Sequence, residues 1–316
     1  MDWLNITLVG PKMKHKLASP FRTVCGASVT LLLALQPAIA QGAPAQDLAA
    51  HPPVSQQEAP AQSYGLASHR AVYELTLGDT GAGSNVSDIR GQLVYDFRGS
   101  PCLGYTLNTR LITEVFDRDG KAATNDIRSE SWEDAEGRRF RFSTSQYTNN
   151  KLAESTKGTA RRPLHSRDAI NVDLEKPKKS SLSFSGKILF PTQHSLSLLK
   201  AAVAGRTRLQ ADIYDGSEKG TKLYETTSVI GAPLELSANS QLPSIKNAGL
   251  LDTIPSWPVV VSYYEPGPNK DGLPSYEISF RMYSNGVSRK LKLDYGTFSL
   301  EGELSSIEFF ETKQCP

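Results

Sequence analysis

The sequence has 316 residues, with 35 lysine and arginine residues against 33 aspartate and glutamate residues, which gives a formal net charge of +2. A balance this even excludes the charge pattern of a nucleic-acid-binding protein, and the short basic segment at residues 176–179 follows Glu175, as in a solvated turn. After residue 40, no apolar stretch approaches the roughly 18 residues that a membrane-spanning helix needs, so no integral membrane segment is expected there.

The first 40 residues have the pattern of a signal peptide. Their basic residues are Lys12, Lys14, Lys16 and Arg22. An apolar run follows at residues 24–35, and Ala38-Ile39-Ala40 matches the small-residue pattern that signal peptidase cuts. The alternative is a membrane anchor, but an apolar helix this short rises only about 18 Å, against a hydrocarbon core of about 30 Å. We therefore expect export and cleavage after Ala40, which also removes Cys25.

Residues 41–63 have the composition of a disordered linker. They contain four prolines and no aromatic residue. Such a segment buries too little apolar surface to offset the entropy lost on ordering. We expect it to serve as a tether or as a simple tail, with the folded domain spanning residues 64–316.

Alternation of apolar and polar residues is the main signal of the folded part. In residues 71–77, Tyr73, Leu75 and Leu77 share one face, opposite Glu74. This period of two is typical of a half-buried strand. Strands are predicted in this way at residues 71–77, 91–97, 105–116 and 138–147, with turns at residues 117–120 and 134–137, and the apolar run at residues 257–264 is interpreted as a buried strand.

One segment has the pattern of an amphipathic helix. Thr192 can cap a helix over residues 193–204, and Gly205 can end it. Leu196, Leu199 and Val203 fall on one stripe, so one side of this helix is expected to face a core.

Asn285-Gly286 predicts a hairpin near the C-terminus. This pair is preferred in two-residue type I′ turns, because both positions need positive φ. A two-residue turn would place Phe280 opposite Leu291 and Ile278 opposite Leu293. The predicted architecture is therefore mainly β: a long, strongly curved, barrel-like antiparallel sheet packed around one amphipathic helix.

Two cysteines, Cys102 and Cys315, remain after signal cleavage. An even pair in an oxidising compartment favours a structural disulfide, and the alternative is two separate buried thiols. A catalytic dithiol would normally have the C-x-x-C spacing, which this distant pair lacks.

Six segments, taken in order, resemble the EipB-type family of periplasmic cell-envelope integrity proteins. They are residues 69–75 (HRAVYEL), 99–106 (GSPCLGYT), 190–194 (FPTQH), 214–218 (YDGSE), 257–264 (WPVVVSYY) and 285–296 (NGVSRKLKLDYG). The resemblance implies a periplasmic location, an antiparallel β-spiral around a helix, and a disulfide at Cys102 and Cys315. It implies a role in envelope integrity but supplies neither a reaction nor a ligand.

Apart from this resemblance, the sequence gives only weak indications of a catalytic, metal or cofactor site. No histidine pair has a metal-ligand spacing, no cofactor or nucleotide motif is present, and we expect no cofactor, no metal site and no enzyme activity. His69-Arg70 is interpreted as a surface or strand-end pair. Asp212, Asp215 and Glu218 cluster, but Asp-Gly-Ser-Glu is first a turn composition.

Four residues remain as candidates for groove or helix-end contacts. His194 lies in the first turn of the predicted helix, and Trp257, Tyr263 and Tyr264 mark the aromatic ends of an apolar strand. The strand would line a groove for lipid or sugar, or pack in the core, and core packing is the better interpretation.

Three functions follow as hypotheses. The first is a noncatalytic protein that contacts other periplasmic envelope proteins, the second is a carrier of a lipid, a glycan or another amphipathic envelope component, and the third is an envelope-polymer hydrolase. A filled interior with an open strand edge would favour the first, and an open apolar groove the second. Convergent polar groups in a groove would favour the third.

Overall fold

The computed structural model describes residues 65–164, 168–236, 245–267, 272–311 and 315. The predicted signal peptide, its cleavage site after Ala40 and the predicted linker at residues 41–63 lie outside the described residues. Within the described residues, no helix has the length and apolar character required to cross a bilayer.

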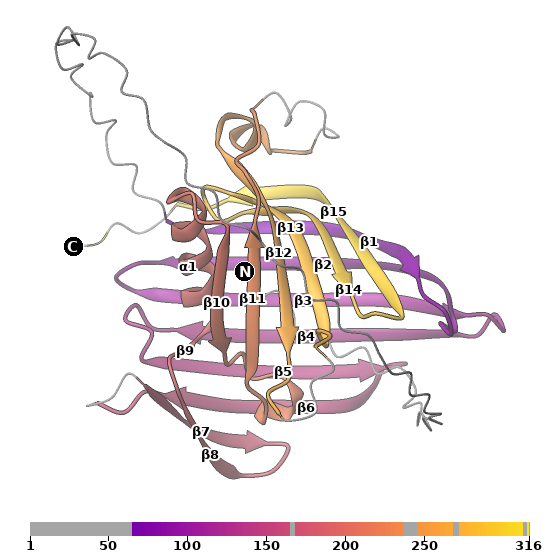
Figure 1. Ribbon diagram of the computed structural model, residues 1–316. Coiled ribbons are helices and arrows are strands. Elements are labelled where there is room, and N and C mark those ends of the chain that lie inside the picture. Colours follow the sequence, from indigo (N-terminus) through magenta and orange to yellow (C-terminus); the bar gives the residue numbers. More distant parts are fainter. Residues whose placement is uncertain (1–64, 165–167, 237–244, 268–271, 312–314, 316) are drawn as a thin grey trace, which may run out of the picture. The chain divides into compact units, whose positions relative to one another are not determined.

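Fifteen strands of the described residues form one sheet (Figure 1). Their bounds are β1 (His69–Thr80), β2 (Val86–Ser100), β3 (Gly104–Asp117), β4 (Ala122–Glu133), β5 (Arg139–Thr148), β6 (Lys151–Arg161), β7 (Ala169–Lys176), β8 (Ser180–Ser185), β9 (Ile188–Leu189), β10 (Arg208–Ile213), β11 (Tyr224–Ile230), β12 (Ser256–Tyr264), β13 (Tyr276–Tyr283), β14 (Ser288–Asp294) and β15 (Phe298–Phe309). The spatial order is β8-β7-β6-β5-β4-β3-β2-β1-β15-β14-β13-β12-β11-β10-β9. β1 and β15 therefore pair in the middle of the sheet.

The two edges of the sheet are tied together by the chain itself. β8 and β9 are the edge strands, and only Gly186 and Lys187 separate them in sequence. So short a link spans at most about 10 Å, which brings the two edges together and nearly closes the sheet into a barrel. The predicted barrel-like antiparallel sheet is confirmed.

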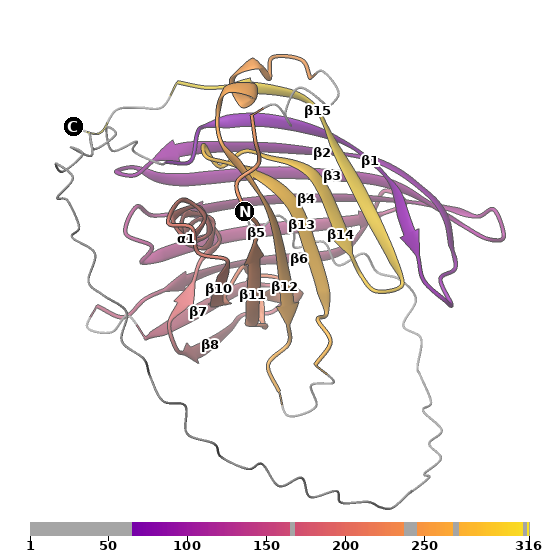
Figure 2. The same cartoon turned by 45° about the horizontal axis from the view of Figure 1, so that its top comes forward.

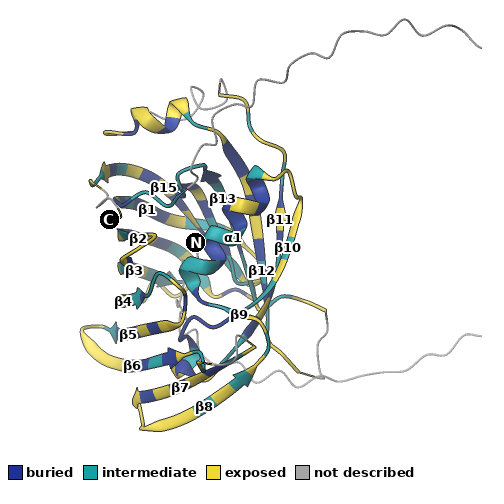
Figure 3. Ribbon diagram, turned by 90° about the vertical axis from the view of Figure 1, so that its left-hand side faces the viewer, coloured by how far each residue is buried: buried dark blue, intermediate teal, exposed yellow. Residues whose placement is uncertain are grey.

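Helix α1 (Pro191–Val203) forms a crossover connection between two parallel strands. β9 and β10 are the parallel pair of the sheet, and α1 connects them. Parallel neighbours require a crossover that returns the chain to the starting end, and a helix usually provides it. Figures 2 and 3 show α1 enclosed by the curved sheet, whose strands lie on several sides of it.

Residues along the strands alternate between buried and exposed positions. This explains why the alternation of apolar and polar residues in the sequence predicted the strands correctly. In β1, Tyr73 and Leu75 are buried and Glu74 and Thr76 are exposed. Figure 3 shows the same alternation of buried and exposed residues in neighbouring strands. Each predicted strand lies on an observed one, and the predicted turns at residues 117–120 and 134–137 lie between strands.

The buried side chains form two clusters. The larger one joins β1–β4, β10–β15 and the inward side of α1, and the smaller one lies between β5–β9 and the start of the helix. From α1, Leu198, Leu199 and Ala202 are buried, whereas Leu196 is only half-buried. The buried stripe is therefore displaced from the one predicted, although one side of the helix faces a core as expected.

The start of α1 differs from the prediction. The helix begins at Pro191 rather than Gln193, and Thr192 is not its cap. Proline is favoured at the first helical position because its fixed φ suits the helix and it has no N–H to satisfy. The next two donors are satisfied from elsewhere, since the backbone N–H groups of Thr192 and Gln193 donate to Glu133 Oε2 and Oε1 at 2.8 and 3.1 Å.

The hairpin between β13 and β14 exists, but the predicted two-residue turn is wrong. Tyr283 N donates to Val287 O and Gly286 N donates to Tyr283 O, with φ +83° at Gly286, so the loop has three residues. This is the pattern of a turn followed by a left-handed glycine. A second irregularity, with φ +55° at Lys290, restores the predicted register, and Ile278 does face Leu293.

Candidate binding site beside the disulfide

The residues predicted to line a groove do not form one. Trp257 and Tyr263 are buried in the larger core, and Tyr263 stacks on Tyr276 with ring centroids 4.4 Å apart. Tyr264 is half-buried on the opposite face of β12, and His194 is fully buried on α1. The structure therefore places these four residues at separate positions, three of them within packed interior.

His69 is the first residue of β1, as the strand-end interpretation of His69-Arg70 expects, but its side chain is not on the surface, which corrects the other interpretation. The imidazole is 2% exposed, its Nδ1–H donates to Ala67 O at 2.7 Å, and the ring stacks on Tyr95. Burial lowers the pKa of His69. The reason is that the side chain points to the inner face of the sheet, where aromatic rings from both neighbouring strands surround it, those of Tyr95 and Phe97 on β2 and of Phe309 on β15.

The carboxylate cluster near residue 215 belongs to a buried turn. Asp215 Oδ1 accepts a hydrogen bond from Ser217 N at 2.9 Å, and Gly216 has φ +78°. A Cβ at Gly216 would lie 2.5 Å from the Phe142 ring, so the turn is packed against the smaller core. Its residues hold the aromatic rings of that core in place.

Cys102 and Cys315 are joined in a disulfide, with their Cα atoms 5.7 Å apart. This spacing is within the usual range for bonded cysteines. The bond ties the β2–β3 turn to the segment that follows β15. Both segments leave the sheet at the same end, because His69 on β1 lies between Phe97 of β2 and Phe309 of β15.

A cavity of about 310 Å³ opens next to this bond, and we call it the outer slot. Its volume lies within the range of small-molecule sites in proteins. The residues lining it are Ser68, Arg98, Gly99, Leu103, Gly104, Thr106, Trp132, Phe310 and Glu311. Five of them come from strands β2, β3 and β4, and two come from the segment between β15 and Cys315.

The shape of the outer slot follows from the strand register. Arg98 pairs with Thr106, Thr106 with Trp132, and Trp132 with Arg141, so the four side chains share one face of the sheet. It is the outer face, because the residues that alternate with these four along the strands point inward. Glu133, next to Trp132 on β4, is one of these buried residues. The short threonine on β3 leaves a trench between two long side chains.

Aromatic rings stacked with guanidinium groups form the walls. The Arg98 guanidinium lies over the Phe310 ring at 3.7 Å, and the Arg141 guanidinium lies over the Trp132 ring at 4.4 Å. Arg98 is also held by two hydrogen bonds to Asp96, at 2.6 and 3.0 Å. These contacts fix the wall side chains before any ligand arrives, which reduces the entropy lost on binding.

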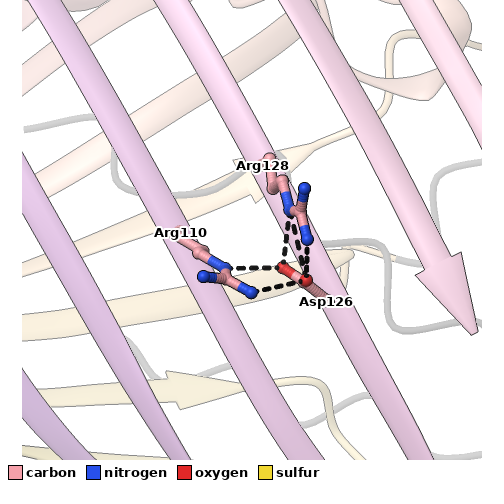
Figure 4. A network of polar contacts seen from close by, with 3 residues as sticks. All are labelled: Arg110, Asp126 and Arg128. Carbon is pink, nitrogen blue, oxygen red and sulfur yellow. Dashed lines mark hydrogen bonds and ion pairs between the residues drawn. The ribbon is translucent and has the colours of Figure 1, made fainter. Parts of the chain in front are cut away.

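The same outer face carries a charged network on β3 and β4 (Figure 4). Asp126 accepts hydrogen bonds from Arg110 at 2.9 and 3.1 Å and from Arg128 at 2.6 Å at closest. The hydrogen bonds from Arg110, together with those from Arg128, lower the pKa of Asp126 to about 2. Two guanidinium groups therefore surround one carboxylate on this part of the face.

Replacing Asp126 with asparagine is expected to destabilise the protein by about 1 kcal/mol at pH 7, because the network lies on a partly exposed face. The folded pKa is below the ordinary value, so the contribution of Asp126 is present above about pH 4 and is lost as the pH falls towards 2. Urea unfolding at pH 7, 4 and 2 should show the D126N variant and the wild type converging at the lowest pH.

The matched control is Asp88→Asn. Asp88 pairs with Arg90 on the same face, but their side chains are 42% and 75% exposed, against 13% for Asp126. We expect almost no effect from this change. Equal losses in D88N and D126N would show that the network around Asp126 adds nothing beyond an ordinary surface pair.

A second cavity, of about 270 Å³, lies where the sheet edges meet. It is lined by residues that include Arg138, Arg162, Lys187 and Gln193. Arg162 is held by Gly137 O at 2.7 Å and Gln193 Oε1 at 3.0 Å, and its guanidinium lies over Phe190. Its charge therefore holds two loops to the start of α1.

Among the described residues, no group of three or more histidine, cysteine, aspartate or glutamate side chains can hold a metal ion.

Comparison with known proteins decides the family. A family model described as EipB-like matches residues 60–311, which is most of the chain. The chain belongs to the EipB-like family. The cell envelope integrity protein EipB of Brucella abortus (strain 2308) is 34% identical over 247 residues, covering 78% of this chain and 85% of that protein.

A solved structure agrees with this EipB-like assignment. The crystal structure of a β-barrel-like protein from Brucella abortus has a TM-score of 0.71 and 33% sequence identity, and it covers 79% of this chain and 100% of its own. The family resemblance found in the six sequence segments is therefore confirmed.

Sequence reasoning did not find the outer slot. Arg98, Trp132 and Phe310 lie far apart in sequence and meet only because β2, β4 and the end of β15 lie near one another. The one local signal is Trp132, a large aromatic residue on the outward phase of its strand. An outward tryptophan flanked by charged residues marks a position where a contact surface is expected.

Proposed function

We propose that this EipB-like protein is a noncatalytic periplasmic protein that maintains cell-envelope integrity through contacts with other envelope proteins. Its relative from Brucella abortus is named a cell envelope integrity protein. The observation that carries the proposal is the packed interior: of the aromatic strand residues that would have lined a cargo groove, Trp257 and Tyr263 are core residues, and Tyr263 stacks on Tyr276. The interactions of such a protein take place on its outside.

The open edge of β8 supports contact with a protein partner. β8 has β7 as its neighbour on one side and ends the sheet on the other. An edge strand presents backbone N–H and C=O groups to which an extended segment of another protein can add. Ser181 and Ser183 point outward along this strand, while Leu182 and Phe184 pack against the smaller core.

A lysine on this edge tests the proposal. We expect Ser183→Lys to leave the melting temperature within about 2 °C of the wild type, because Ser183 is exposed and surface substitutions cost little. Lysine is a common means of preventing edge pairing. The variant should therefore fail to restore the resistance of a strain without this gene to an envelope-disrupting detergent, such as deoxycholate.

Ser143→Lys is the matched control. Ser143 lies on the outer face of β5, paired on both sides by β4 and β6, and offers no free edge. This variant should restore resistance fully. Full restoration by both variants would remove the edge of β8 from the proposal, and unchanged detergent resistance of the strain without the gene would overturn the role in envelope integrity.

A further inference from the structure

We propose that the outer slot is a carbohydrate-binding site that takes one pyranose ring of an envelope glycan. The slot is separate from the edge of β8, since it lies over β2, β3 and β4 beside the disulfide. This proposal therefore stands or fails independently of the proposed function.

The width of the slot suits a flat ring. Arg98 and Trp132 stand on strands two apart, which puts their backbones about 9.5 Å from each other. A ring packed between two flat groups needs about 3.5 to 4 Å of contact distance on each side, or about 7 to 8 Å in all. Thr106 between them is short enough to leave that space open.

The chemistry of the walls suits a sugar. The Arg141 guanidinium covers the Trp132 ring from the β5 side, so the ring face towards β3 is the one that lines the slot. An indole face is electron-rich and attracts the weakly positive C–H groups on the apolar face of a pyranose. The polar groups at the rim are the guanidinium of Arg98, the carboxylate of Glu311 and the hydroxyl of Thr106. They can donate to and accept from the sugar hydroxyls.

The same slot is less suited to binding a peptide or a lipid chain. β2, β3 and β4 are each paired on both sides, so the floor offers no edge for an added strand. The slot is also open and contains charged groups, which a lipid chain would have to desolvate. A small ring with one apolar face and a polar rim matches all of these features.

The experiment uses two soluble probes, triacetylchitotriose and maltotriose, with the protein as it exists after export. The described part of the chain contains two tryptophans, Trp132 in the slot and Trp257 in the core, so sugar binding should change the fluorescence of Trp132 alone. A contact with one ring is expected to give a dissociation constant of about 1 mM for at least one of the probes.

Two variants locate the binding. Thr106→Leu fills the trench and leaves the reporter in place, and it should abolish the fluorescence change. Trp132→Ala, measured by calorimetry, should weaken binding at least tenfold. The control is Tyr147→Ala, which removes an equivalent ring on β5 that stacks with Arg128 at 5.1 Å on the same outer face but does not line the slot. It should bind as the wild type does.

Three outcomes with the trisaccharides would overturn the proposal. They are an absence of binding by both trisaccharides up to 20 times the expected constant of about 1 mM, sugar binding that survives both slot variants, and a loss of binding in Y147A equal to that in W132A. Thermal unfolding of each variant separates loss of the site from loss of the fold. A proline-rich peptide that binds in place of the sugars would identify the slot as a peptide site and reject the carbohydrate.

Discussion

Removal of the disulfide will lower the melting temperature of this protein by roughly 5 to 15 °C. The bond closes a loop of 213 residues, for which chain-entropy models give up to about 5 kcal/mol and typical measurements about 2–4 kcal/mol. In a protein of this size, each kcal/mol corresponds to about 2–4 °C. The double variant Cys102→Ser/Cys315→Ser, followed by circular dichroism on heating, measures this loss.

The reduced wild-type protein is the control for the double variant. Both lack the same covalent link, so both should melt together, and reductant should have no effect on the double variant. The bond holds the segment after β15 against the β2–β3 turn, so the outer slot should lose its Phe310 wall in the same samples. A double variant that melts like the oxidised wild type would show that the β1–β15 pairing alone holds that segment.

Replacing Glu133 with alanine is expected to cost about 3 kcal/mol. The carboxylate is 3% exposed and accepts from the N–H groups of Thr192 and Gln193, which no other acceptor in the helix can satisfy. Each buried donor left without an acceptor costs about 1–3 kcal/mol. Urea unfolding at pH 7 would measure the change in the free energy of unfolding.

Two further variants test the cause of that loss. Glu133→Gln keeps one acceptor oxygen but turns an amide donor towards the second N–H, so its cost should be intermediate. Glu130→Ala, on the exposed face of the same strand, should change the free energy by less than about 0.5 kcal/mol. If E130A and E133A cost the same, the contact between β4 and α1 does not stabilise the fold.

Much of the fold could be predicted from the sequence because its signal is local. Tyr73 and Leu75 fall on the same side of a strand whatever that strand pairs with, and the apolar stripe of the helix predicted at residues 193–204 requires a core whatever forms it. The family resemblance rested on short segments in a fixed order. None of these signals depends on which strands are neighbours.

The errors arose where distant segments meet. Thr192 is a good cap by composition, but Glu133 is 59 residues away and reaches the helix because β4 curves past it. His69 looked exposed because the pairing of β1 with both β2 and β15 cannot be derived from its own residues. The outer slot could not be predicted from local patterns for the same reason, because its lining comes from four separate parts of the sequence.

The order of the strands has a consequence for how the chain folds. If the sequence were cut at Gly186 and its ends joined, the strands would follow one another around the sheet in chain order, β9 to β15 and then β1 to β8, with α1 as the crossover from β9 to β10. In the natural sequence this order is divided into two halves, with β1–β8 first and β9–β15 after them. Each half consists of neighbouring strands that can pair early, because the loops to be closed are short. Because it pairs residues from opposite ends of the described fold, such as His69 and Phe309, we expect the β1–β15 seam to form last, and the disulfide lies across it.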